Sequence, residues 1–83
     1  MDRGLKAFLV VAQEGSITAA ASKINLTQSS VTKRIATLES EIGVSLFYRD
    51  RRGMSLTEAG QLFLLRAKRI AVSYTHLTLP TKA

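Results

Sequence analysis

Residues 16–42, SITAAASKINLTQSSVTKRIATLESEI, decide the fold of this 83-residue chain. Ser16 and Thr27 each carry a hydroxyl that favours the N-cap of a helix, because its oxygen accepts a bond from a free backbone N–H. They predict a short helix over residues 17–24 and a longer one over residues 28–42, separated by a turn of about three or four residues. The alanines of the short helix allow another helix to approach closely. The stretch therefore predicts a helix-turn-helix.

The longer helix has two different faces. One narrow stripe is apolar, at the spacing of a buried helix face, and consists of Val31, Ile35, Leu38 and Ile42. The opposite face is small, polar and cationic, and consists of Ser29, Lys33, Ala36 and Ser40, with Thr32 at its edge. Small side chains let a helix lie deep in the major groove of DNA, where hydroxyl, amide and ammonium groups bond to base edges. A merely solvated face is the alternative interpretation.

A basic hairpin is predicted after this helix. Residues 44–49 nearly alternate between apolar and polar types and predict a strand, and residues 54–56 return as a second one. Residues 50–53, DRRG, form the turn, because Asp and Gly favour turns. The two strands make a wing that carries Arg49, Arg51 and Arg52.

Two further helices are predicted on either side of this unit. Residues 3–14 form the first, and its buried face consists of Leu5, Phe8, Leu9 and Ala12. Residues 57–71, with Thr57 as N-cap, are apolar on more sides than one small domain covers. The surplus predicts pairing with a second copy of the chain, through Leu62, Phe63, Leu65 and Ile70.

The composition excludes several classes of protein. No Cys and one His exclude a disulfide framework and a Cys-based or multi-His metal site. The longest clean apolar run, residues 7–12, is far shorter than the roughly 20 residues of a membrane span, and the N-terminus is a poor signal peptide. We therefore expect a cytoplasmic protein with no membrane partner. With 12 Lys or Arg against 6 Asp or Glu, the formal charge of +6 favours a polyanionic partner, usually nucleic acid.

No catalytic, metal or cofactor site is predicted. The sequence contains neither a P-loop nor a G-x-G-x-x-G motif. Residues 30–33, SVTK, match the S-x-x-K pattern of serine acyl-enzymes, but the partner motifs of those enzymes are missing. His76 has no matched nucleophile. We expect that the chain is not an enzyme and uses no cofactor.

Several strings, in order and without a gap, resemble a known family. They are GSITAAA at residues 15–21, TQSSVTKRI at 27–35, LESEIGVSLFYR at 38–49 and LTEAG at 56–60. Over about residues 3–71 the chain looks like the N-terminal domain of the LysR-type transcriptional regulators. The resemblance implies a mainly α fold, in which a winged helix-turn-helix of three helices and a two-stranded wing precedes a long linker and dimerisation helix. It also implies a homodimer that binds double-stranded promoter DNA, and an effector-binding domain that is absent here together with its small-molecule effector.

The pattern and the resemblance together predict which residues contact DNA. Base edges are assigned to Gln28, Ser29, Thr32 and Lys33, and phosphates to Ser30 and Arg34. Thr18 can reach a phosphate from the start of its helix. In the wing, Arg49, Arg51 and Arg52 are assigned to phosphate or to the minor groove, although Arg49 could instead lock the wing to the domain. Lys33 stands where the family often has Arg, and a point charge lacks the bidentate guanine contact.

The chain divides into three predicted parts. Residues 1–56 form the winged helix-turn-helix, residues 57–71 the linker and dimerisation helix, and residues 72–83 a tail. Residues 72–81, VSYTHLTLPT, resemble a translation of the transposon-end adapter that is used to prepare sequencing libraries. We expect this tail to be foreign to the protein, and a genuine disordered tail is the alternative.

The predicted function is sequence-specific binding of double-stranded DNA by a bacterial transcriptional regulator. Helix 28–42 lies in the major groove, and wing 49–53 lies on the backbone or in the minor groove. The alternative is a protein-interaction module that dimerises through residues 57–71, with basic faces that only keep it soluble. A cationic amphipathic helix on a membrane is a weaker alternative, because lipid-facing aromatics are not clearly present.

Overall fold

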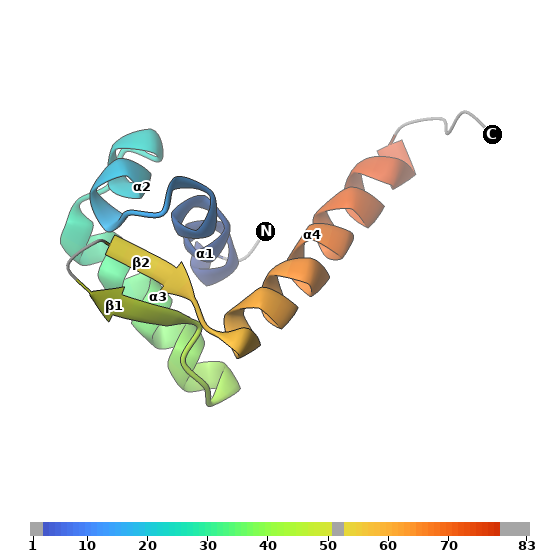
Figure 1. The fold of residues 1–83 in the computed structure, drawn as a ribbon. Helices are drawn as coiled ribbons and strands as arrows, with labels where there is room; N and C mark the ends of the chain where they lie inside the picture. The colour runs from blue at the N-terminus through green and yellow to red at the C-terminus, as the bar shows by residue number, and fades with distance from the viewer. Residues whose placement is uncertain (1–2, 51–52, 79–83) are drawn as a thin grey trace.

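The computed structural model describes residues 3–50 and 53–78, with side chains through Arg69. The elements follow one another as α1 (Arg3–Glu14), α2 (Ile17–Lys23), α3 (Gln28–Ile42), β1 (Phe47–Asp50), β2 (Gly53–Leu56) and α4 (Glu58–Thr78). The first three helices and the hairpin form one body, and α4 runs outward from it (Figure 1). The prediction of a mainly α winged helix-turn-helix with a long last helix is therefore confirmed.

Local capping explains where the helices begin and end. The Ser16 hydroxyl accepts a hydrogen bond from the Ala19 N–H at 3.1 Å, and the Thr27 hydroxyl accepts one from the Ser30 N–H at 3.1 Å. Gly43 has a φ of 80° and ends α3 in a conformation that strains other residues. Both predicted N-caps and the predicted range of α3 are confirmed, whereas α2 ends at Lys23 and not at residue 24.

The core forms where α1 packs against α2, α3, α4 and β2. Its fully buried side chains are Ala7, Phe8, Val11, Ala20, Val31, Ile35 and Leu46. Of the predicted buried face of α1, only Phe8 is fully buried, and the half-buried members of that face are Leu5, Leu9 and Ala12. The prediction is wrong in part because α1 is covered on several sides. Its neighbours, and not its most apolar stripe, decide which side chains lose contact with water.

The segment that joins α3 to β1 also differs from the prediction. Ile42, the last residue of the predicted apolar stripe, is 39% exposed, and Val44 is 47% exposed. β1 begins at Phe47 and not at Val44. Leu46 stays outside the strand ladder because its backbone N–H bonds to the Glu39 side chain and its C=O accepts from the Thr57 N–H.

The wing is a short antiparallel pair that rests on the turn between α1 and α2. Phe47 lies opposite Leu56, and Asp50 lies opposite Gly53 at the other end of the ladder. The Met54 N–H donates to the Gly15 carbonyl at 3.3 Å and ties β2 to that turn. The predicted two-stranded wing is confirmed, while Arg51 and Arg52 at its tip lie outside the described residues.

α4 begins at a capped end and continues beyond its predicted boundary. The Thr57 hydroxyl accepts a hydrogen bond from the Gly60 N–H at 2.9 Å, as the predicted N-cap requires. The sequence predicted an end at Ala71, but the helix continues to Thr78. The prediction was wrong because Thr has a lower helix propensity than Ala without breaking a helix.

Candidate nucleic-acid interface

One side of α3 is free of the core and carries four of the predicted contact residues. Gln28, Ser29 and Lys33 are exposed, and Thr32 is half-buried beside them. The apolar stripe of the same helix explains this arrangement, because Val31 and Ile35 are fully buried and turn the opposite face outward. The N-terminal half of α3 therefore presents an amide, two hydroxyls and an ammonium group to one side.

Ser30 and Arg34 lie on the flank of α3, at the border of this face. Both are half-buried. The Ser30 hydroxyl oxygen accepts a hydrogen bond of 3.0 Å from the Thr27 hydroxyl, which leaves its own hydrogen available to a ligand. Both residues line a surface hollow together with Lys33. The hollow is continuous with the outer face of α3 because Lys33 belongs to both.

The remaining predicted contacts come from α2 and the wing. Thr18 is exposed in the first turn of α2. Arg49 is exposed on β1, and within the described part of the chain its side chain makes neither a hydrogen bond nor an ion pair. The alternative that Arg49 locks the wing to the domain therefore has no contact to support it.

The outer face of α3 stays cationic because the acidic side chains nearby are engaged elsewhere. In residues 3–50 and 53–69, the only ion pair joins Lys23 to Glu14 at 3.2 Å. Glu39 accepts a hydrogen bond of 2.7 Å from the Leu46 backbone N–H, so its charge is held at the base of the wing. Sequence reasoning missed this role, because no local pattern marks a carboxylate that caps a backbone group seven positions away.

The predicted dimer residues of α4 do not all face the same way. Leu62 is 53% exposed and Leu65 is 61% exposed, so both are available to a partner. Phe63 instead points to the core, where its ring meets Phe8 edge-on with 5.0 Å between ring centroids. The side chain of Ile70 lies outside the described residues.

The described residues offer neither a metal-binding cluster nor a membrane-spanning helix. These residues contain no cluster of His, Cys, Asp or Glu that could hold a metal ion. None of the helices in the same ranges combines the length and the apolar character that crossing a membrane requires.

Comparison with known sequences identifies the family. Residues 3–61 match the profile of the bacterial regulatory helix-turn-helix proteins of the lysR family. The transcriptional regulator ClcR of Pseudomonas putida is 46% identical over 68 residues, and YofA of Bacillus subtilis is 48% identical over 66 residues. These alignments cover 82% and 80% of this chain but only 23% of each relative, so the chain spans about a quarter of their length.

Solved structures agree with the sequence comparison. The crystal structure of the CbnR DBD–DNA complex has a TM-score of 0.85 and 38% identity, and covers 94% of this chain and 91% of that one. The complex of the BenM DBD with benA site 1 DNA has a TM-score of 0.86 and 30% identity, and covers 94% of this chain and 92% of that one. The profile match, the identities and the shared fold lead to one conclusion: the chain belongs to the LysR family of bacterial regulatory helix-turn-helix proteins.

Proposed function

We propose that this chain is the DNA-binding domain of a bacterial transcriptional regulator and binds double-stranded DNA in a sequence-specific manner. The observation that carries the proposal is the chemistry of the outer face of α3. Small polar side chains and Lys33 are exposed there, and the N-terminal half of the helix contains no acidic residue. A helix with such a face fits the major groove. The CbnR and BenM domains, solved as DNA complexes, share this fold and support the proposal.

Different residues of the interface serve different purposes in this proposal. Base edges are read by Gln28, Ser29, Thr32 and Lys33. Phosphates are bound by Ser30, Arg34, Thr18 and the wing arginines Arg49, Arg51 and Arg52. The phosphate contacts supply much of the affinity and hold the protein in register, whereas the base contacts select the sequence.

We further propose that two copies pair through the outer side of α4. Leu62 and Leu65 form an exposed apolar strip, and the helix runs away from the body that could have covered it (Figure 1). Burial of this strip against a second α4 removes apolar surface from water. The α3 helices of the two copies then face the same duplex, and the preferred DNA site has dyad symmetry.

The proposal assigns no catalysis to this chain and places it in the cytoplasm, where bacterial DNA lies. We propose no small-molecule site within this chain, which spans about a quarter of the length of its relatives. A protein-interaction module that acts only through α4 is the competing function, favoured by the same exposed leucines.

Salt-dependent binding to duplex DNA tests the proposal. We expect log Kobs to fall linearly with log salt concentration, with a slope of roughly −0.9 for each phosphate neutralised. Retention on a DNA resin at moderate salt supports the DNA-binding function. Dimerisation without retention on the resin, or a flat response to salt, contradicts it and favours the interaction module.

A further inference from the structure

A basic hollow lies beside the outer face of α3, between the first turn of α1 and the flank of α3. Its volume is about 350 Å³. Three cations line it, Arg3 from α1 and Lys33 and Arg34 from α3, together with the hydroxyls of Ser30 and Thr37. Glu41 also lines it. No function is predicted for Arg3 from the sequence, because no local pattern connects residue 3 to residue 34.

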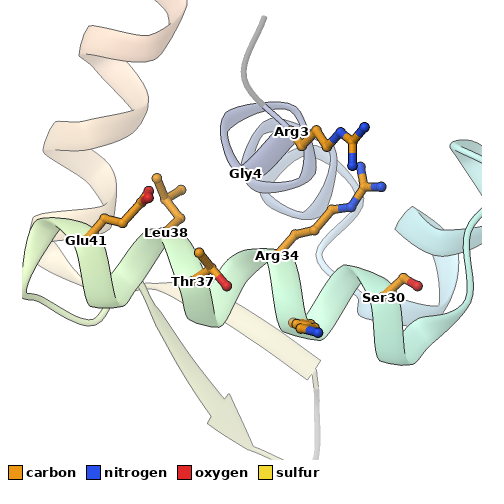
Figure 2. A pocket seen from close by; sticks show the side chains of 8 residues that line it. Arg3, Gly4, Ser30, Arg34, Thr37, Leu38 and Glu41 are labelled. Carbon is orange, nitrogen blue, oxygen red and sulfur yellow. The ribbon is translucent and has the colours of Figure 1, made fainter.

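The two arginines approach the hollow from separate helices. Figure 2 shows the side chains of Arg3 and Arg34 extending toward the same place, whereas Glu41 lies at the opposite end of the row, beyond Thr37 and Leu38. Arg3 is exposed, and Arg34 is half-buried. In the described part of the chain, neither guanidinium pairs with a carboxylate. Among the described residues, Glu41 is the only carboxylate that lines the hollow and it pairs with neither arginine, so an anion between the two guanidinium groups would be attracted by both.

The chemistry of the lining selects a phosphate. A guanidinium presents planar N–H donors that match two oxygens of a phosphate at once, and such charge-assisted bonds are about twice as strong as neutral ones. The hydroxyls of Ser30 and Thr37 add donors to the lining of the hollow. Lys33 links the hollow to the outer face of α3, so a duplex held on that face brings its own backbone to the hollow.

We propose that Arg3 and Arg34 together bind one backbone phosphate of the duplex, at the edge of the major groove that α3 occupies. The inference rests on the proposed function and deepens it, because it adds the N-terminal end of α1 to the DNA interface. A phosphate is present at every step of the backbone, so the contact strengthens binding to every sequence equally. Free phosphate would use the same donors, but it is not part of a duplex that the outer face of α3 also binds.

The double variant Arg3→Gln with Arg34→Gln tests this assignment in the full chain. Binding is measured over a range of salt concentrations to two duplexes, one selected by the protein from a random pool and one of scrambled sequence. We expect the affinity for both duplexes to fall about tenfold or more and the salt slope to become shallower by about one unit. The matched control is Lys68→Gln with Arg69→Gln, which removes the same charge from exposed positions on α4. Circular dichroism of both variants confirms the fold.

A second measurement uses the selected duplex with single phosphates replaced by uncharged methylphosphonates. One replacement at the edge of the site should weaken DNA binding by the unaltered chain and leave DNA binding by the double variant unchanged. Inorganic phosphate at millimolar concentration should not compete, and competition would assign the hollow to the free ion instead. If the double variant behaves like the α4 control, or loses affinity for the selected duplex alone, the phosphate assignment is wrong while the proposed function stands. If the unaltered chain binds neither duplex, the proposed function itself fails.

Discussion

The carboxylate of Glu39 in α3 accepts a hydrogen bond of 2.7 Å from the backbone N–H of Leu46, the residue before the wing. The C=O of Leu46 in turn accepts from the Thr57 N–H at 3.0 Å, and the Thr57 hydroxyl donates to the Ser45 carbonyl at 2.7 Å. The end of α3, the entry to the wing and the start of α4 are therefore joined through one short segment. The orientation of the outer face of α3 relative to α4 depends on these bonds.

Removal of the Glu39 acceptor should lower stability. Leu46 is fully buried, so Glu39→Ala leaves its N–H without a partner, which costs about 1–3 kcal/mol of unfolding free energy. Urea denaturation measures this difference. The control is Glu41→Ala on the exposed side of the same turn, where we expect a change below about 0.5 kcal/mol. Equal stability of the two variants would show that the Glu39 bond contributes nothing.

The first turn of α4 has no room for a side chain at Gly60. A Cβ there would meet the Leu46 carbonyl oxygen and would lie 3.0 Å from Leu56 Cδ2. Helix propensity alone favours Gly60→Ala by about 1 kcal/mol, whereas the overlap is expected to cost about 1–3 kcal/mol or more. We therefore predict a lower thermal midpoint.

The control for Gly60→Ala is Gly43→Ala. A Cβ added at Gly43 would meet no other atom within 4 Å, so the only cost there is the positive φ of 80°. That strain should cost roughly 1–2 kcal/mol. A Gly60→Ala variant that melts above the unaltered chain would mean that propensity outweighs the close approach of α4 to Leu46.

Lys33 should contribute to the choice of sequence. Lys33→Ala is expected to reduce the preference for the selected duplex over a scrambled one by about 1–3 kcal/mol, because the proposed function assigns the exposed ammonium of Lys33 to base edges. Competition binding with the two duplexes measures the preference. Lys68→Ala on α4 serves as the control. An equal loss of affinity on both duplexes would move Lys33 to the class of phosphate contacts.

Leu65 should hold two copies together. Leu65→Glu places a charge in the exposed apolar strip of α4 and is expected to shift sedimentation toward the monomer. Ser22→Glu on the exposed side of α2 adds the same charge elsewhere and should leave the sedimentation unchanged. A Leu65→Glu variant that sediments like the unaltered chain would rule out pairing through this side of α4.

The tail should be dispensable. Among the described side chains, the buried core extends no further than Ala67, so a chain that ends at Ala71 should lose less than about 0.5 kcal/mol of stability. Its affinity for DNA should also be unchanged. A clear loss of either would show that residues 72–83 belong to the protein, and the codons behind these residues give an independent test of the adapter origin.

The sequence by itself determined the features that depend on near neighbours. The caps at Ser16 and Thr27, the range of α3 and the hairpin after it all follow from bonds or periodicities within a few residues. The free face of α3 was predictable for the same reason, since a buried stripe on a helix defines the opposite side as well.

Only the tertiary structure decided what lies between distant parts of the chain. In the folded chain, Ala7 and Val11 of α1 are buried in the core and Phe63 packs against Phe8. Arg3 and Arg34 line the same hollow. Each of these depends on how one helix crosses another, and the crossing is set by the packing of all the helices together. The periodicity of a single segment contains no information about which neighbour will cover it.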